Sequence, residues 1–378
     1  MKDIVIAGYA RSPFHFATKG ALTKVRPDDL AAHVVKGLIE RTGVNPDDVE
    51  DLILGCAFPE GEQGFNMARL VVLMAGLPIS VAGTTVNRFC GSSMQAIHMA
   101  AGAIQMGAGE VFICAGVESM SRVPMSGFNP MPNPALCESM PAAYMSMGET
   151  AENVGREYAV SREEQEVFAV ASQHKAGEAQ AKGRLSDEIV PIAVNGSSVD
   201  EDGCLRPTTD LEGLAGLKLA FDENGTVTAG TSSPLTDGAA ATLVCSLEYA
   251  NANGLKPMAR IASIAVSGCK PETMGLGPIF SSRKALSRAG ISAQDLDVIE
   301  INEAFATQSI ASIRDLELDT AKVNIDGGAI AIGHPLGATG ARITGKAAQV
   351  LQREGGRYAL STQCIGGGQG IATVLEVA

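Results

Sequence analysis

The amino-acid sequence predicts an α/β fold built from two duplicated halves. Strand-like and helix-like stretches alternate near both ends of the chain, as in layered α/β domains. One stretch also recurs, because residues 43–52 and 290–299 share a Gly–apolar start, an acidic middle and an apolar end. In addition, 46% of the residues are apolar and 43 are glycine, while only 4% are aromatic. This composition is typical of an α/β core with tight turns and close backbone packing.

Within the first half, four short apolar or β-prone runs predict strands, at residues 4–7, 51–55, 83–89 and 111–116. Three intervening patterns predict helices, at residues 28–42, 66–76 and 92–106. Gly43 fits the left-handed position that ends many helices. The second copy of the repeat also follows a helix and enters a strand. This alternation predicts a β/α layer in each half.

The stretch at residues 118–230 interrupts the alternation and predicts an insertion in the first half. Residues 120–147 hold six methionines and five prolines with little periodicity. They fit either an irregular loop that packs on a partner subunit or an adaptable apolar wall of a binding site. A capping box at Ser161 and Glu164 predicts a helix that continues to about residue 182. The predicted domains are therefore residues 1–250, with the insertion at about 118–230, and residues 255–378.

The net charge of −13 argues against binding to nucleic acid or to an anionic membrane surface. No apolar run is long enough to span a bilayer, and the N-terminal residues do not fit a secretory signal. The eight cysteines are scattered without a C-x-x-C pair, so no metal site is predicted. Unpaired thiols are typical of a reducing compartment, and we expect a cytoplasmic protein.

Cys90 stands at the junction between a predicted strand and the small-residue helix at residues 92–106. The free N–H groups and the positive dipole end of a helix favour thiolate over thiol. The thiolate is the reactive form of cysteine, so Cys90 is the predicted nucleophile. Taken alone, Cys90 fits a buried structural cysteine beside a tight turn better than a nucleophile, since free cysteines are often buried.

Three further residues carry potential chemistry, and each lies in a short distinctive block of the sequence. His334 and Cys364 stand among glycines that let backbone and ligand approach closely. Asn302 opens the block at residues 302–306. Each also has a structural alternative: His334 in a turn, Cys364 in packing, and Asn302 as a helix cap. From residue types and spacing alone, the sequence supports only a Cys/His site.

The blocks at residues 86–96, 302–306, 324–340 and 364–370 resemble the thiolase family in order and spacing. The resemblance runs from residue 4 to the C-terminus, so it covers nearly the whole chain. It implies a thiolase-like fold, with two duplicated βαβαβαββ halves and a loop-domain insertion in the first half. It also implies an acyltransferase that joins or splits a carbon–carbon bond next to a thioester carbonyl.

The resemblance assigns a catalytic role to five residues. Cys90 would carry the acyl group as a thioester, and Cys364 would be the base and acid at the substrate α-carbon. His334 would help Cys90 ionise and would donate a hydrogen bond to an enolate oxygen, while Asn302 would hold a water in that oxyanion site. The N–H groups of Cys90 and Gly366 would form a second oxyanion site around the acyl-enzyme.

Within the family, the sequence is similar to the bacterial degradative branch, the 3-ketoacyl-CoA thiolases of fatty-acid β-oxidation. Biosynthetic acetoacetyl-CoA thiolases have Asn-Ala-Ser where this chain has residues 231–233, and a histidine where it has Ser146. An acetoacetyl-CoA thiolase therefore stays as the first alternative. A non-catalytic acyl-CoA or lipid-binding member of the family is the alternative of another class.

The resemblance also implies ligand contacts and partners. Coenzyme A would be a substrate, and no other cofactor is expected. Ser233 would contact the pantetheine arm of CoA, and Arg206 its adenine or phosphate end. Met147 and Met274 would line the acyl pocket. A homodimer or homotetramer and a partner in a fatty-acid oxidation complex complete the expectations.

Overall fold

The computed structural model of the protein describes residues 2–378, and its core is one mixed sheet of ten strands. The first half supplies β1 (Ile4–Arg11), β2 (His15–Phe16), β3 (Asp51–Gly55), β4 (Ala82–Val86), β5 (Val111–Ser119) and β8 (Thr236–Ser246). The second half supplies β9 (Ala259–Gly268), β10 (Val298–Ile301), β11 (Tyr358–Ile365) and β12 (Gln369–Glu376). A separate hairpin pairs β6 (Ile192–Val194) with β7 (Ser197–Val199). The predicted α/β class is confirmed.

The strand order shows the duplication. It runs β10-β11-β12-β9-β1-β8-β5-β3-β4, with β2 paired to β8, so that the two halves are mirrored about the β1–β9 junction. At that junction Val5 pairs with Arg260 and Ile6 with Ala259. One parallel strand pair keeps the same register in both halves. Asp51 of β3 pairs with Phe112 of β5, and Val298 of β10 pairs with Ala359 of β11.

The halves differ where β4 would have a counterpart. In the second half only an isolated parallel bridge forms, between Ile299 and Val323. The next residue, Asn324, is left-handed with φ 46°, so the chain turns away from the strand direction. Its side chain then replaces the next rung of the ladder, because Asn324 Oδ1 accepts from Ile301 N–H and Nδ2 donates to Ile301 O, each at 3.0 Å.

Helices cover both faces of the sheet. The α-helices are α1 (Pro27–Thr42), α2 (Met67–Met74), α3 (Ser92–Gln105), α4 (Pro134–Ser139), α5 (Met147–Glu157), α6 (Arg162–Ala181), α7 (Leu211–Ala215), α8 (Leu247–Ala252), α9 (Gly277–Ala289), α10 (Ala306–Asp315), α11 (Ala329–Ile332) and α12 (Leu336–Glu354). The 3₁₀ turns are η1 (Pro46–Asp48), η2 (Gly61–Gln63), η3 (Pro141–Tyr144), η4 (Ser186–Glu188), η5 (Ala229–Thr231), η6 (Pro271–Leu276) and η7 (Ala293–Asp295).

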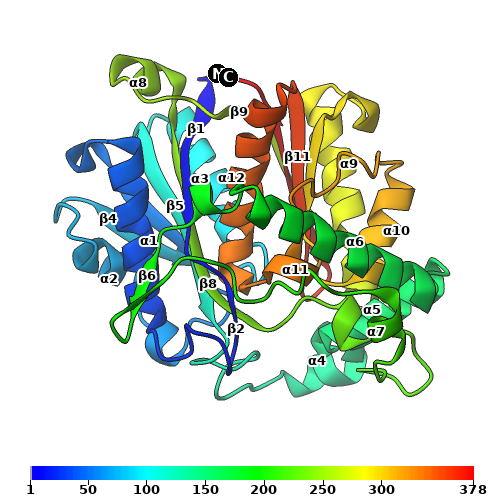
Figure 1. Cartoon of the computed structure of the whole chain (residues 1–378). Coiled ribbons are helices and arrows are strands. Elements are labelled where there is room, and N and C mark those ends of the chain that lie inside the picture. The colour runs from blue at the N-terminus through cyan, green and yellow to red at the C-terminus, as the bar shows by residue number, and fades with distance from the viewer. Residues whose placement is uncertain (1) are drawn as a thin grey trace.

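These helices form three layers around the two halves of the sheet. The α1 helix packs on β1, β5 and β8, and α9 packs on β9, β11 and β12, so that each half has its own outer layer. Between the halves lie α3 and α12, which pack on each other (Figure 1). The α12 helix contacts strands of both halves and is buried along most of its length. The N-termini of α3 and α12 therefore open at the same place, between the two halves.

The repeat found in the sequence has the same local structure in both copies. Gly43 and Gly290 both end a helix in the left-handed region, with φ 67° and 71°. Only a residue without a Cβ adopts this conformation at little cost, which explains both glycines. A 3₁₀ turn, η1 or η7, follows each glycine and leads into β3 or β10. Residues at matching positions of the repeat therefore occupy equivalent places in the two halves.

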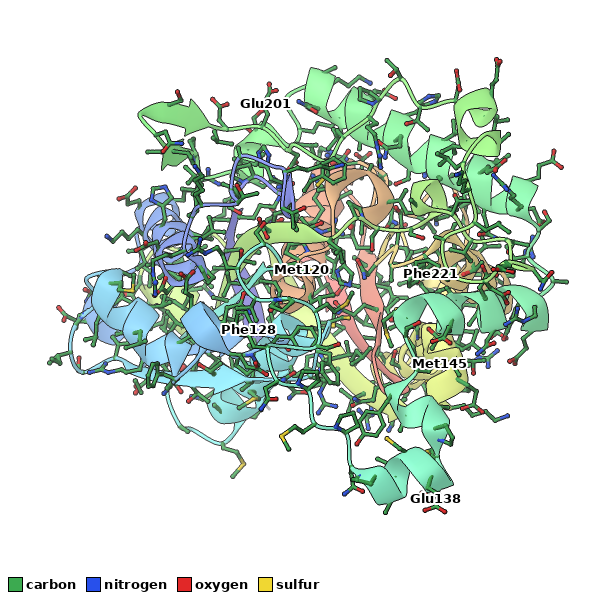
Figure 2. The ribbon with its side chains drawn as sticks, turned by 90° about the horizontal axis from the view of Figure 1, so that it is seen from below. Met120, Phe128, Glu138, Met145, Glu201 and Phe221 are labelled. Atoms are coloured by element: carbon green, nitrogen blue, oxygen red, sulfur yellow. The ribbon has the colours of Figure 1, made fainter. Side chains whose placement is uncertain are left out.

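Residues 120–235 connect β5 to β8 and carry α4 to α7. Ser146 with Glu149, and Ser161 with Glu164, form capping boxes at the starts of α5 and α6, the second as predicted. The methionine-rich part is less irregular than expected, since it contains α4 and η3. Figure 2 shows this part running from Met120, near the centre of the view, out to Glu138 at the edge of the molecule. Among residues 2–378, no helix is long and apolar enough to cross a membrane.

Candidate active site

The Cys90 turn joins β4 to α3, and its backbone is held in a strained shape. Phe89 adopts φ 43°, which is uncommon for a bulky residue. Asn87 Oδ1 accepts from Phe89 N–H at 2.8 Å. Ser92 Oγ accepts from Arg88 N–H at 2.9 Å and donates to Phe89 O at 2.6 Å. Such strain persists only where surrounding contacts over-determine the turn, and it is common at functional sites.

The Cys90 side chain is buried, and its ionisation differs from the sequence-based expectation. Burial raises the pKa of Cys90 to about 12, although the N–H groups of Gly366 and of Cys90 itself act in the opposite direction. The expectation that the helix N-terminus makes Cys90 a ready thiolate was wrong, because desolvation outweighs the backbone donors. Cys90 is therefore a thiol at neutral pH and needs a base to become a nucleophile.

His334 provides a neutral imidazole at the start of α12. Its Nδ1 lies 2.6 Å from Thr339 Oγ1, and that hydroxyl donates to Pro335 O at 2.9 Å. Since the Thr339 proton is committed to Pro335, Nδ1–H is the donor and Nε2 keeps its lone pair. Burial, followed by the charge of Arg342, lowers the pKa of His334 to about 3. The imidazole is therefore neutral in the folded protein, and Nε2 is its hydrogen-bond acceptor.

Asn302 lies directly after β10 and contacts this imidazole. Its Nδ2 is 3.3 Å from His334 Nε2. Its Oδ1 is buried and has no hydrogen-bond partner in the described part of the chain. A buried acceptor without a partner is costly, so this position suits a bound water or a ligand donor.

Cys364 is the penultimate residue of β11 and points into an apolar cluster with Met274, Ala304 and Phe305. Met147 packs against the same cluster. Burial, followed by the charge of Cys90, raises the pKa of Cys364 well above its ordinary value. Because the charge of Cys90 acts on Cys364, the two thiols lie near each other, although they come from opposite halves of the chain.

The structure brings together most of the residues singled out in the sequence. The contacts above link Cys90 with Gly366 and Cys364, and His334 with Asn302. Met147 and Met274 flank Cys364, and a Cβ built on Gly366 would lie 3.5 Å from Met147 Sδ.

Two predicted ligand contacts lie further out. Ser233 is half-buried, and both its N–H and its Oγ donate to Ala304 O at 3.0 Å, two residues from Asn302. Arg206 is exposed, and its guanidinium lies 5.3 Å from the centre of the Phe16 ring. Its backbone N–H donates to Gln173 Oε1. The contacts of Arg206 are thus with β2 and α6 rather than with the cysteine cluster.

Sequence reasoning missed Glu118, a buried carboxylate at the end of β5. It accepts from Ala57 N–H at 2.8 Å, from Gln63 Nε2 at 2.7 Å and from Gly337 N–H at 2.9 Å. Burial raises the pKa of Glu118, while the donors around it oppose that rise. Glu118 thereby ties the loop after β3 to the start of α12. An acidic residue at the end of an apolar strand was the signal for it in the sequence.

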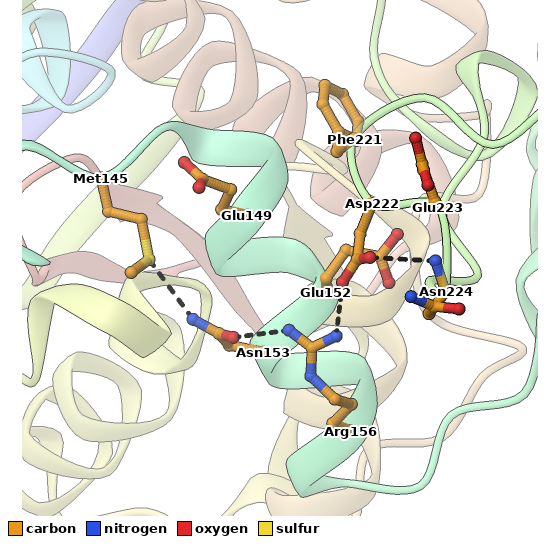
Figure 3. A pocket seen from close by; sticks show the side chains of 9 residues that line it. All are labelled: Met145, Glu149, Glu152, Asn153, Arg156, Phe221, Asp222, Glu223 and Asn224. Atoms are coloured by element: carbon orange, nitrogen blue, oxygen red, sulfur yellow. Dashed lines mark hydrogen bonds and ion pairs between the residues drawn. The ribbon is translucent and has the colours of Figure 1, made fainter.

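A surface pocket of about 410 Å³ lies beside α5. Figure 3 shows its lining side chains, among which Arg156 bridges Asn153 and Asp222. Phe221 lines this pocket and meets Phe305 edge-on, with ring centres 5.9 Å apart. Phe305 belongs to the cluster around Cys364. An adjoining pocket of about 530 Å³ is lined by Phe221 and Lys218.

The arrangement has the parts needed for acyl transfer coupled to proton transfer at carbon. It contains one thiol that faces two backbone N–H groups, a second thiol nearby and a neutral imidazole whose Nε2 is an acceptor. Within residues 2–378, no group of three or more His, Cys, Asp or Glu side chains could hold a metal ion.

Comparison with known proteins gives matches over the full length. Residues 4–248 match the family model of the thiolase N-terminal domain, and residues 255–377 match that of the thiolase C-terminal domain. The chain is 47% identical to the 3-ketoacyl-CoA thiolase of Bacillus subtilis and 48% identical to that of Aliivibrio fischeri, with all of each chain covered. The structure of human mitochondrial 3-ketoacyl-CoA thiolase in complex with CoA superposes with a TM-score of 0.93 at 37% identity, covering 100% of this chain and 98% of the human one.

Proposed function

The chain belongs to the thiolase family, and from this membership we propose that it is a 3-ketoacyl-CoA thiolase of fatty-acid β-oxidation. It uses CoA to split a 3-ketoacyl-CoA into acetyl-CoA and a shortened acyl-CoA. The observation that carries the proposal is the meeting of two buried thiols from opposite halves, with Gly366 N–H directed at Cys90. CoA is the substrate that this chemistry requires, and no further cofactor is needed.

In the first half-reaction, His334 Nε2 takes the proton of Cys90, and the thiolate attacks the 3-keto carbon of the substrate. The N–H groups of Cys90 and Gly366 stabilise the oxyanion. Collapse breaks the bond between the α-carbon and the keto carbon. The acyl group stays on Cys90 as a thioester, and the electron pair leaves as the enolate of acetyl-CoA. His334 and a water on Asn302 bind the enolate oxygen, while Cys364 protonates the α-carbon.

In the second half-reaction, acetyl-CoA leaves and CoA enters. The Cys364 thiolate, formed in the previous step, takes the proton of the CoA thiol. The CoA sulfur attacks the Cys90 thioester, and the same two N–H groups hold the oxyanion. Cys90 leaves as a thiolate and recovers its proton from His334. Cys90, His334 and Cys364 thus return to their starting protonation states.

For the substrate contacts, we place the pantetheine arm at Ser233 and the acyl chain at Met147 and Met274. Arg206 is the cation that the sequence suggests for the phosphate end of CoA. The structure supports Lys218 as a second one, because Lys218 lines the 530 Å³ pocket beside Phe221 and has no ion pair among residues 2–378. Removing the charge of the true phosphate contact raises the KM for CoA and leaves kcat nearly unchanged.

We also propose that the chain forms a homodimer, or a tetramer built from such dimers. The β4 strand lies at the edge of the sheet, and an unpaired edge is a natural site for association. Large apolar side chains near that edge, on α2, on α3 and after them, are exposed: Leu73, Ile79, Met99 and Met106. Exposed apolar side chains near an unpaired sheet edge are typical of a subunit interface. A partner in a fatty-acid oxidation complex and a cytoplasmic location remain part of the proposal.

Steady-state thiolysis across 3-ketoacyl-CoAs of four to twelve carbons tests the function. Methionine side chains re-pack at low cost, so a wall of methionines accepts chains of different length. We expect kcat/KM to hold or rise with chain length, since each buried methylene contributes about 0.8 kcal/mol. A steep fall beyond four carbons would favour an acetoacetyl-CoA thiolase. Binding of acyl-CoA without turnover would favour the non-catalytic alternative.

A further inference from the structure

The carbonyl group of Cys90 lies outside the hydrogen-bond ladder of α3. The helix begins at Ser92 with Gly91 as its N-cap, and no backbone N–H in residues 2–378 donates to Cys90 O. A buried carbonyl without a partner costs free energy, so a donor must come from elsewhere. The side chain of Gln363 supplies it, because its Nε2 donates to Cys90 O. Gln363 is fully buried and directly precedes Cys364.

The first half solves the same packing problem without a side chain. In the register of the repeat, Gly116 corresponds to Gln363 and Gly337 to Cys90. A Cβ built on Gly116 would lie only 2.0 Å from Gly337 O, so the two backbones touch. In the second half the Gln363 side chain occupies the corresponding space. It therefore holds the Cys90 turn at a fixed separation from β11.

A second link joins the same two segments. Arg88 Nη1 donates to Gln369 Oε1 at 2.7 Å, and Arg88 Nε donates to Gln95 Oε1 at 2.8 Å. Gln369 pairs with Ile365 in the hairpin of β11 and β12. Arg88 is half-buried and forms no ion pair with any carboxylate of the described residues, so its guanidinium is available for these two amides. The hydrogen bonds of Gln363 and Arg88 thus join the Cys90 turn to the β11–β12 hairpin on either side of Cys364 and Gly366.

We propose that Gln363 and Arg88 are positioning residues, which hold the Gly366 N–H against the Cys90 sulfur by tying the nucleophile turn to the Cys364 hairpin. Neither side chain needs to touch the substrate for this role. The kinetic part of the inference rests on the proposed function, whereas the effect on the Cys90 thiol does not. Loss of a tether lets Gly366 move away from Cys90, and the thiolate then loses one of its two backbone donors.

The test replaces Gln363 by methionine, which has similar length and no amide. Alkylation of Cys90 by iodoacetamide is followed between about pH 7 and pH 10, because only the thiolate reacts. Peptide mass analysis separates Cys90 from the other seven cysteines. We expect the pH–rate profile of Gln363→Met to move to higher pH by about one unit, or about tenfold in rate at a fixed pH. The matched control is Gln352→Met, since Gln352 is exposed and donates to Pro257 O far along α12.

Arg88 gives an independent variant that keeps the test decisive if Gln363→Met does not fold. Arg88→Met should move the profile in the same direction, and Arg88→Lys should restore part of it because a cation can still reach Gln369. Thiolysis by these variants should lose about tenfold in kcat, with KM within about twofold. Parent-like alkylation profiles in folded variants would overturn the proposal. An absence of thiolysis in the parent would refute the proposed function instead, and the alkylation result would stand.

Discussion

The ends of β3 and β5 in the first half and the ends of β10 and β11 in the second are copies of one repeat with opposite uses. In the first half, Gly116 lets α12 approach so closely that Gly337 packs backbone against backbone, and Gly55 lets the first turn of α3 approach in the same way. At the matching positions the second half has Asn302 and Gln363, and the residue that matches Gly337 is Cys90. In the first half, glycines allow direct backbone contact. In the second half, polar side chains at the matching positions line the candidate active site.

The difference teaches how a duplicated fold acquires one active site rather than two. Close backbone contact between strand ends and a helix start leaves no room for a ligand. Where side chains hold the same elements apart, polar groups can point at a substrate. The two cysteines show the same division. Cys90 faces two backbone donors and suits a nucleophile, whereas Cys364 sits in an apolar cluster and suits a proton carrier.

The largest effect is expected from replacing Cys90, the residue that stands in the candidate active site where the matching Gly337 makes a backbone contact. Cys90→Ala should abolish labelling by acetyl-CoA and should lower thiolysis by at least about 10⁴-fold, because no other group can carry the acyl chain. Intact mass after incubation with acetyl-CoA checks this, with one acetyl group expected per parent chain. A label on any other cysteine of an active parent would contradict the assignment.

Cys364→Ala separates the two thiols by role. The variant should still accept an acetyl group on Cys90, because the nucleophile and its donors remain. It should lose α-proton exchange and thiolysis by about 10³-fold, since the acid and base at carbon is gone. Mass analysis and deuterium exchange into acetyl-CoA measure the two properties on one preparation. Near-normal turnover would remove Cys364 from the mechanism.

Gly116→Ala tests the tight backbone contact between Gly116 and Gly337 in the first half. The added Cβ would lie 2.0 Å from Gly337 O, and backbone on both sides leaves little room to adjust. We expect the free energy of unfolding to fall by about 3 kcal/mol, as for other overpacked sites. Gly216→Ala is the control, because its Cβ would lie 3.7 Å from the nearest atom, and its stability should change by less than about 0.5 kcal/mol. Equal urea midpoints for the two variants would show that the backbone contact between Gly116 and Gly337 is not tight.

Much of this organisation could be predicted from the sequence. The repeat at Gly43 and Gly290 located both helix ends, because only a left-handed position needs glycine there. The four blocks located Cys90, Asn302, His334 and Cys364, since their residue types and order are specific. Their contacts in the structure agree with one site, while their individual roles stay predictions.

Other features could not be predicted from local patterns. The pKa of Cys90 depends on burial by residues far away in the chain, so the helix-dipole argument gave the wrong direction. Glu118 and Gln363 act through partners more than fifty residues away, and neither stands in a recognisable motif. Such contacts arise only when distant segments of the chain pack together, so the sequence marks Glu118 as an acidic residue at the end of an apolar strand without showing its partners.

The smallest expected effect concerns a third matched pair, Ile53 in the first half and Glu300 in the second. Glu300 is buried, and its Oε2 lies 3.1 Å from Arg342 Nη1. Burial raises the pKa of Glu300 from 4.5 to about 7, although Arg342 and Lys346 oppose that rise. The folded protein therefore keeps a proton that the unfolded chain releases. The stability due to this proton is fully present below about pH 4.5 and is lost as the pH rises to about 7.

Glu300→Gln removes this titration while keeping the shape of the side chain. The stability of the parent relative to Glu300→Gln should fall by about 1 to 3 kcal/mol between pH 5 and pH 8. Urea unfolding at several pH values measures the difference. Glu40→Gln, on the exposed face of α1, is the control and should stay parallel to the parent. If Glu300→Gln were also parallel, Glu300 would be ionised throughout, and its pairing with Arg342 would outweigh the burial that distinguishes it from Ile53.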